Sequence, residues 1–179
     1  MKAHCNADIR RYIFGILLTL EIEFTTMKKL LLVCMENICR SPMALAVARK
    51  MAVDAGCKNQ FEFDSAGTHT HHPGERPDPR VRLTLSRHGY GLERLRARRI
   101  SVSDFERFDL ILAVDARVLV DLQQLCPPDT RGKLCLFLDY ADDVEETEIP
   151  DPYFGNTEGF ERVFNLCEVG VRGLLRRLA

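Results

Sequence analysis

The chain has 179 residues, of which 46% are hydrophobic and 28% charged. This length is typical of one domain, and the composition excludes disordered, collagen-like and repeat proteins. The 25 lysines and arginines nearly cancel the 26 aspartates and glutamates, so the chain has no strong overall charge that would attract nucleic acid or an anionic membrane.

Residues 1–26 differ from the rest of the chain. Their apolar run, 12–20, is shorter than the roughly 20 residues of a membrane span, and no small-x-small cleavage site follows it before Glu21 and Glu23. We therefore expect an N-terminal extension over residues 1–26, either disordered or translated from an upstream start codon, with export as the weaker alternative. The folded domain is predicted to span residues 27–179.

From Met27 on, apolar strands alternate with helices. Asp115 is placed to cap the helix that follows it, and Ser41 and Pro42 suit the N-cap and first position of another helix. The predicted strands are 30–33, 61–66, 110–114 and 134–138, and the predicted helices contain 43–48, 79–88, 116–125 and 157–178.

This alternation predicts an α/β fold with a parallel sheet and helices on both faces, which makes three layers. In such sheets ligands bind beyond the carboxyl ends of the strands. The loop after the first strand is therefore the first place to look for a functional site.

The seven cysteines indicate a reducing compartment. Their number is odd, and they lack the dense spacing of a secreted disulfide framework, so we expect a cytoplasmic protein. No CxxC pair and no repeated Cys/His cluster at zinc spacing occur. We expect neither a metal nor another cofactor.

The loop Cys34–Pro42 places a cysteine at a strand end and an arginine six positions later, just before a helix. Backbone N–H groups in such a loop can point inward and bind a tetrahedral oxyanion, and the helix dipole adds positive potential. Arg40 can grip two phosphate oxygens with its planar fork. The same positive field favours the thiolate of Cys34, the form that attacks phosphorus. Ser41 can donate a hydrogen bond to that thiolate, and Asn37 suits a turn with positive φ.

The segment Val33–Pro42 is similar to the phosphate-binding loop of low-molecular-weight protein tyrosine phosphatases, whose pattern is V-C-x-G-N-I-C-R-S-P. The resemblance covers residues 27–179 and implies a four-stranded parallel sheet, of the phosphotyrosine phosphatase I type, and hydrolysis of phosphotyrosine through a phosphocysteine. Further segments that resemble the family, in the same order, are 64–68, 78–80, 97–101, 109–115 and 151–155.

The resemblance also implies roles for individual residues. Asp151 is expected to protonate the leaving phenolate and then to activate water, which makes Cys34, Arg40 and Asp151 the catalytic residues. Tyr153, Phe154 and His71 are expected to be walls of the substrate slot. The other expected substrate-binding residues lie in the loop itself: Met35, Glu36, Asn37, Ile38, Cys39 and Ser41.

We have separate expectations for three further residues, His72, Cys39 and Glu36. His72 is expected to support the loop through hydrogen bonds to Asn37. Cys39 matches a family cysteine that forms a reversible disulfide with the nucleophile, although a small buried thiol is the alternative. Glu36 stands where the family usually has glycine, so a positive φ there would be strained, and its carboxylate would repel substrate. We expect its side chain to point to solvent.

Three alternative functions remain. An arsenate reductase shares the loop but passes electrons to thioredoxin through a flexible thiol pair; Cys126 and Cys135 are nine positions apart, but Cys135 falls in a predicted strand. A phosphoarginine phosphatase is expected to have threonine in place of Ile38. A catalytically impaired phosphate-binding module is the third alternative, and Glu36 is its motive.

The expected partner is a tyrosine-phosphorylated protein, either a bacterial tyrosine kinase or a host protein, and the enzyme is expected to be a monomer that binds neither nucleic acid nor membrane. Arg94, Arg96, Arg98 and Arg99 form a basic stretch that is typical of a solvated face. Its alternatives are contact with an acidic phosphopeptide or with the acidic loop 142–148.

Overall fold

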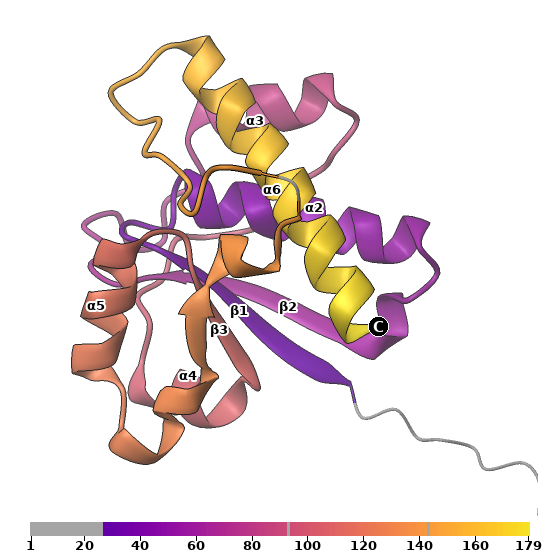
Figure 1. Ribbon diagram of the computed structural model, residues 1–179. Coiled ribbons are helices and arrows are strands. Elements are labelled where there is room, and N and C mark those ends of the chain that lie inside the picture. Colours follow the sequence, from indigo (N-terminus) through magenta and orange to yellow (C-terminus); the bar gives the residue numbers. More distant parts are fainter. Residues whose placement is uncertain (1–26, 93, 143) are drawn as a thin grey trace, which may run out of the picture.

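The computed structural model describes residues 27–92, 94–142 and 144–179 (Figure 1). The expectations for the extension, residues 1–26, lie outside the described residues. None of the helices in the described ranges is both long enough and apolar enough to cross a membrane.

The described residues form a four-stranded parallel sheet in the order β2-β1-β3-β4. The first strand along the chain lies inside the sheet, and its apolar run 30–33 is fully buried, because neighbouring strands and helices cover it on every side. The strands are β1 (Lys28–Cys34), β2 (Phe61–Gly67), β3 (Leu110–Ala113) and β4 (Leu134–Leu136).

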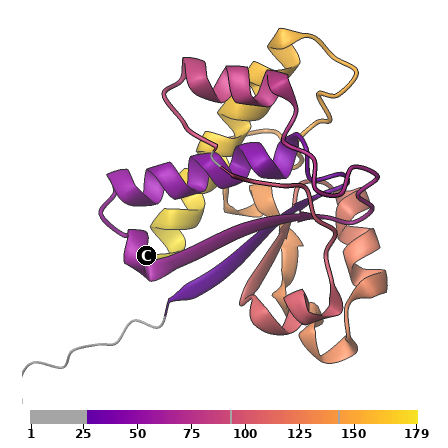
Figure 2. The same ribbon diagram turned by 180° about the vertical axis from the view of Figure 1, so that it is seen from behind.

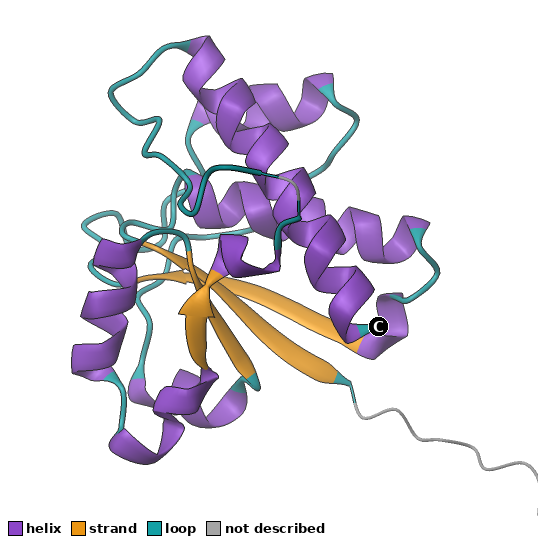
Figure 3. Ribbon diagram, viewed as in Figure 1, coloured by secondary structure: helices purple, strands orange, loops and turns teal. Residues whose placement is uncertain are grey.

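Helices cover both faces of this sheet, which confirms the predicted three-layer α/β fold (Figures 1 and 2). One face carries α2 (Arg40–Asp54), α3 (Pro79–Arg87) and α6 (Thr157–Leu178), and the other carries α4 (Val102–Arg107) and α5 (Ala116–Leu125). Figure 3 distinguishes the strands from the helices that cover them. The described residues also form three short 3₁₀ helices: η1 (Lys58–Gln60), η2 (Pro128–Lys133) and η3 (Phe137–Tyr140).

Several predicted boundaries differ from those of the structure. The strand predicted to reach Leu138 ends at Leu136, because the chain turns into η3. The short helix α4 was not predicted, since six residues are too few for a periodic pattern, and its start depends on a capping box between Ser101 and Asp104. Helix α2 begins at Arg40, so Ser41 lies inside it and is not its N-cap.

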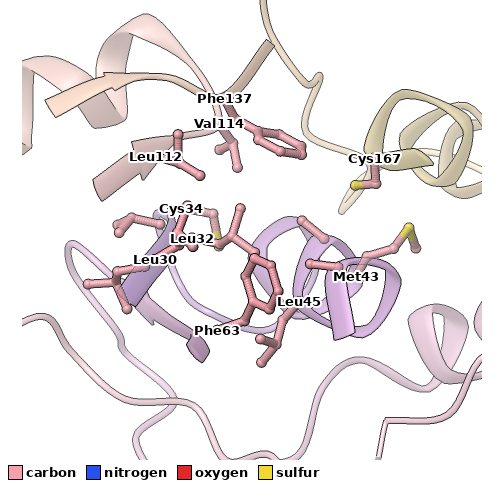
Figure 4. Packing of buried hydrophobic residues seen from close by; sticks show 14 of the residues in the cluster. Leu30, Leu32, Cys34, Met43, Leu45, Phe63, Leu112, Val114, Phe137 and Cys167 are labelled. Carbon is pink, nitrogen blue, oxygen red and sulfur yellow. The ribbon is translucent and has the colours of Figure 1, made fainter. Parts of the chain in front are cut away.

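The core lies between the sheet and the helices α2 and α6. Side chains of β1, β2 and α2 meet those of α6 and η3 there, among them Phe63, Met43 and Cys167 (Figure 4). Helix α6 lies so close to η3 that a Cβ on Gly170 would be 2.7 Å from the Phe137 ring. This close packing of α6 needs glycine.

The register of the sheet brings several loops to one edge. Cys34 pairs with Gly67, and Val33 pairs with Ala113, so β1, β2 and β3 end at the same level. The loops that follow these three strands therefore lie together at the carboxyl edge of the sheet. Every candidate site residue follows one of the strands at this edge or lies in the loop before α6.

Candidate active site

Asn37 anchors the loop between β1 and α2. Its backbone has a φ of 58°, and its side chain is fully buried. The amide Nδ2 donates to Ser41 Oγ and Ser65 Oγ, each at 2.9 Å, and Oδ1 accepts from the Arg98 N–H at 3.0 Å. These bonds satisfy the buried amide and fix the loop to β2 and to the segment before α4.

Cys34, the last residue of β1, lies at the bottom of the loop and is 3% exposed. Its Sγ is 3.0 Å from Ser41 Oγ and accepts a hydrogen bond from the Asn37 N–H at 3.2 Å. The N–H groups of Ile38, Cys39 and Arg40 donate to no acceptor in the described parts of the chain. Together with the start of α2, they form a site that suits a tetrahedral oxyanion.

Gly67, at the end of β2, lets the next loop approach Cys34. A Cβ at this position would be 2.5 Å from Met35 O and 2.8 Å from Thr70 Oγ1, so no other residue fits without moving the backbone. The Thr68 N–H also donates to Cys34 O at 3.0 Å. The sequence shows a glycine at the end of a strand, but it does not show that Met35, in the loop after β1, lies against this glycine.

Arg40 extends from the first position of α2 and is 5% exposed. Its Nη1 donates to Asp115 Oδ2 and to Ile149 O, the latter at 3.1 Å, and its Nη2 is 3.4 Å from Asp151 Oδ2. Burial works against its charge, yet the negative charges of Cys34, Asp151 and Asp115 raise the pKa of Arg40 above its ordinary value. The guanidinium therefore stays charged.

Asp115 is a residue whose role at the site the sequence did not indicate. As predicted, it caps α5, because its Oδ1 accepts from the Val118 N–H at 2.7 Å. Its other oxygen holds Arg40. The sequence indicated the helix cap. It did not indicate that the same carboxylate also holds Arg40, because that contact depends on β1 and β3 lying side by side.

We expect Asp115→Asn to raise the inhibition constant of inorganic phosphate by about tenfold, because the Arg40 fork loses its charged anchor. Asparagine caps helices as well as aspartate does, so the thermal stability of α5 is maintained. Asp115→Ala removes the cap as well and lowers the stability by a further ~1 kcal/mol. An unchanged inhibition constant in Asp115→Asn would show that Arg40 does not depend on this contact.

Asp151 lies in the loop before α6 and faces the guanidinium of Arg40. Its side chain is 51% exposed, and its Oδ1 accepts from the Tyr153 N–H at 3.2 Å. The carboxyl group therefore has access to solvent on one side and, on the other, to the loop Cys34–Pro42, which we call the oxyanion loop. This position suits a group that exchanges protons with both a substrate and water.

A pocket of about 290 Å³ opens above the loop. Most of the residues expected to bind substrate line it, whereas Cys34, Asn37 and Ser41 are buried and do not. Its lining consists of Met35, Glu36, Ile38, Cys39, Arg40, His71, His72, Asp151, Tyr153 and Phe154.

Two adjacent aromatic residues form one wall of this pocket. The rings of Tyr153 and Phe154 meet edge to face at 5.0 Å, and Phe154 is 97% exposed. Arg80 holds the wall from behind, because its Nη1 donates to Tyr153 O at 2.9 Å and its guanidinium is paired with Asp78. Hydrogen bonds from Arg80 keep the pKa of Asp78 below its ordinary value. Asp78 in turn donates its N–H to Ile38 O at 2.9 Å, which links the wall to the loop.

Contrary to our expectation, the Glu36 side chain does not point to solvent. Its Oε2 accepts from the His71 N–H at 2.6 Å, and its Oε1 is 2.7 Å from His71 Nδ1, so it ties the oxyanion loop to the loop after β2. The described non-glycine residues with positive φ are Asn37, Thr70 and Arg94, so Glu36 carries no such strain.

The Glu36–His71 contact predicts a pH-dependent stability. Partial burial works against the Glu36 carboxylate, but the hydrogen bonds from His71 outweigh it and keep the pKa of Glu36 below its ordinary value of 4.5. The stabilisation is therefore complete above pH 4.5 and is lost as the pH falls through the lowered pKa. We expect Glu36→Gln to have a lower Tm than the parent at neutral pH and the same Tm in strong acid. Glu75→Gln, at an exposed carboxylate beside His72, is the matched control.

The expected support of Asn37 by His72 is wrong. The partners of Asn37 are Ser41, Ser65 and Arg98, as described above, and His72 Nδ1 lies 3.2 Å from Glu75 Oε2. Small buried hydroxyl groups of α2 and β2 reach the amide because these elements already pack against the loop. His72 remains a residue of the pocket lining.

Cys39, in the same loop as Cys34, is buried. Burial, with a further effect of the negative charge of Asp78, raises the pKa of the Cys39 thiol to about 12. This thiol is therefore protonated at neutral pH and is a poor nucleophile.

The basic stretch 94–99 is only partly a solvated face. Arg98 pairs with Asp64 and Asp104, each at 2.9 Å, and Arg99 Nε donates to Thr68 O at 3.0 Å. Among the described acids of the loop 142–148, Asp142 and Glu146 pair with arginines of α6, and none pairs with this stretch. Only Arg94 and Arg96 of the stretch are left unpaired among the described residues.

No group of three or more histidine, cysteine, aspartate or glutamate side chains within the described ranges is placed to hold a metal ion. Rather, the fold and the site combine a buried thiol, unpaired N–H groups and a charged arginine around one loop. This combination is typical of phosphoryl-transfer enzymes.

Comparison with known proteins identifies the family within this class. Residues 29–179 match the family of low molecular weight phosphotyrosine protein phosphatases, and the chain belongs to it. A low molecular weight protein-tyrosine-phosphatase of Streptomyces coelicolor is 44% identical over 146 residues, which are 80% of this chain and 88% of that protein. A low molecular weight phosphotyrosine protein phosphatase of Schizosaccharomyces pombe is 42% identical over 133 residues, or 74% and 85% of the two chains.

Solved structures agree with this assignment. A protein tyrosine phosphatase from Entamoeba histolytica, crystallised with Hepes in its active site, superposes with a TM-score of 0.82 at 36% identity, over 84% of this chain and 96% of that chain. YfkJ from Bacillus subtilis superposes with a TM-score of 0.80 at 35% identity, over 85% and 94% of the two chains.

Proposed function

We propose that this protein hydrolyses phosphotyrosine in proteins through a phosphocysteine intermediate on Cys34. The observation that carries the proposal is that a charged arginine and a half-exposed carboxyl group, Arg40 and Asp151, line one pocket at the loop that begins with the buried thiol of Cys34. The membership in the phosphatase family supports the same reaction.

The first step transfers the phosphoryl group to sulfur. The Cys34 thiolate attacks phosphorus as the bond to the tyrosine oxygen breaks, and Asp151 gives its proton to the leaving phenolate. The N–H groups of the loop and the Arg40 fork stabilise the charge on the three phosphoryl oxygens. Ser41 Oγ, 3.0 Å from the sulfur, stabilises the thiolate before attack and when it leaves again.

The second step releases phosphate. The Asp151 carboxylate takes a proton from a water molecule, whose oxygen attacks the phosphocysteine while the bond between sulfur and phosphorus breaks. Inorganic phosphate leaves, and Cys34 returns as the thiolate. The exposure of half of the Asp151 side chain supports this role, since water reaches it directly.

The pocket shape supports a preference for phosphotyrosine over phosphoserine. Cys34 is buried, whereas Tyr153, Phe154 and His71 line the pocket at its loop, so we infer that a substrate needs a long, flat side chain to reach the sulfur. A matched pair of peptides that differ only in phosphotyrosine or phosphoserine tests the proposed function. We expect release of phosphate from the phosphotyrosine peptide alone, and equal release from both would contradict the proposed slot.

The observations favour none of the three alternatives. Cys135 lies in β4, and the sulfur of Cys126, at the end of α5, is 3.1 Å from Thr130 Oγ1, so neither belongs to a mobile thiol pair as an arsenate reductase needs. Ile38 lines the pocket, where we expect threonine in a phosphoarginine phosphatase. Glu36 bonds to His71, which argues against an impaired phosphate-binding module.

We also propose that Cys39 protects the nucleophile from irreversible oxidation. A peroxide would oxidise Cys34 to a sulfenic acid, and the Cys39 sulfur would then displace its hydroxyl as water to form a disulfide. The short, shared loop supports this step. The pKa of about 12 makes the Cys39 thiolate scarce at neutral pH, so the disulfide should form slowly.

We place the protein in the cytoplasm as a monomer acting on tyrosine-phosphorylated proteins, a bacterial tyrosine kinase among them. All six described cysteines are free, which supports a reducing compartment. Residues 27–179 are proposed as the folded domain, and the match of the family to residues 29–179 supports this boundary.

A further inference from the structure

A second pocket, of about 420 Å³, lies outside the active site and is lined by four arginines. Three less polar residues complete its lining, so it combines a concentrated positive charge with apolar surface. The arginines are Arg76, Arg82, Arg94 and Arg96, and the other residues are Pro77, Leu92 and Leu95.

The fold brings these arginines together from three segments. The Gly74 N–H donates to Ala97 O at 2.8 Å, and the Ala97 N–H donates to Glu75 O at 2.9 Å, so the segments with Arg76 and Arg96 run side by side. Arg82 lies on α3, which starts directly after the first of these segments. Arg94 has a φ of 58°, a strained conformation for a residue with a Cβ.

These four arginines differ from the other arginines near the site. Arg80 is paired with Asp78, and Arg98 with Asp64 and Asp104. By contrast, all four arginines of the second pocket are exposed, and none forms an ion pair with any carboxylate in residues 27–92, 94–142 and 144–179. In a chain of nearly balanced charge, this is a local positive field with unused planar donors.

The second pocket is a neighbour of the active site. His72 lines the active-site pocket and Arg76 lines the second one. The Glu75 N–H donates to His72 O at 3.1 Å, so this segment turns, and the two residues are closer than the ~14 Å that four extended residues span. The Asp78 N–H bond to Ile38 O holds the end of this segment against the oxyanion loop. One extended peptide can therefore occupy both pockets.

We propose that the second pocket binds a second phosphotyrosine of the same substrate protein, about four residues from the one being hydrolysed. Guanidinium groups bind phosphoryl oxygens in bidentate pairs. The partly exposed side chains of Leu92 and Leu95 suit an aromatic ring. This proposal rests on the proposed function, so the experiment has to distinguish the absence of a second phosphotyrosine site from the absence of phosphatase activity.

The test compares three peptides with the same phosphotyrosine in the active site. About four residues away, the first peptide carries a second phosphotyrosine, the second carries tyrosine, and the third carries glutamate. In the parent protein we expect the KM of the doubly phosphorylated peptide to be about fivefold to tenfold lower than that of the other two. Added salt should reduce this difference, since the pocket is exposed.

Arg94→Ala/Arg96→Ala should abolish this preference and leave p-nitrophenyl phosphate hydrolysis unchanged, which also shows that the variant folds. Arg131→Ala is the matched control. Arg131 is exposed in η2, which leads into β4, and β4 is the edge strand opposite β2. Equal KM values for the three peptides, or an equal gain from glutamate, would overturn the second-phosphotyrosine site while phosphatase activity persists. Loss of all hydrolysis in the parent would instead contradict the proposed function.

Discussion

Replacing Cys34 with serine is expected to lower kcat for p-nitrophenyl phosphate by about 10⁴-fold or more, because the serine hydroxyl keeps its proton and cannot form the phosphocysteine. Binding of inorganic phosphate should persist, since the N–H groups of the loop and Arg40 are untouched. Steady-state kinetics measures the loss of kcat, and calorimetric titration of the Cys34→Ser protein with inorganic phosphate, compared with the inhibition constant of phosphate in the parent, measures the binding.

Cys135→Ser is the matched control for this substitution. Cys135 lies in β4, away from the pocket, and burial raises the pKa of its thiol to about 11, so it is a poor nucleophile. We expect this variant to keep the kcat of the parent. A Cys34→Ser protein that turned over at a similar rate to the parent would mean that another group attacks the substrate.

Asp151→Asn is expected to lower kcat by about 10²-fold to 10⁴-fold, the usual contribution of general acid–base catalysis. The asparagine amide can still accept the Tyr153 N–H hydrogen bond, so the loop should keep its position. The loss should be larger for phenyl phosphate than for p-nitrophenyl phosphate, because p-nitrophenolate leaves without a proton. The pH profile of kcat should also change, since the titrating carboxyl group is gone.

Glu148→Gln provides the control, because Glu148 is an exposed carboxylate three residues earlier in the same loop. Its kcat and pH profile should equal those of the parent. An equal loss for both substrates in Asp151→Asn would argue that Asp151 orients Arg40 rather than transferring a proton to the leaving group.

The fold was predictable because its strands are short apolar runs that alternate with capped helices. The run 30–33 and the cap Asp115 each indicated their element without any tertiary information. Helix α4 was missed because it has only six residues. The end of β4 was placed too late because the apolar sequence continues into η3. Apolar character alone does not tell a strand from a buried 3₁₀ turn.

The site was predictable where its residues are neighbours in the chain. Cys34 and Ser41 are seven positions apart in one segment, so the spacing of the residues between them already indicated a phosphate-binding loop. What the sequence did not indicate depends on contacts between distant segments: Asp115 with Arg40, and Glu36 with His71. The Glu36 contact reversed our expectation of a solvent-facing side chain, because the sheet register places the loop after β2 beside the oxyanion loop.

The phosphocysteine is tested most directly by trapping it. Asp151→Asn, quenched in denaturant during turnover of p-nitrophenyl phosphate, is digested with trypsin, and the peptide of residues 30–40 is sequenced by mass spectrometry. This peptide contains both Cys34 and Cys39, so fragmentation assigns the modified sulfur. We expect one phosphoryl group on Cys34. A phosphoryl group on Cys39, or an unmodified peptide from protein that is still turning over, would contradict the proposed mechanism.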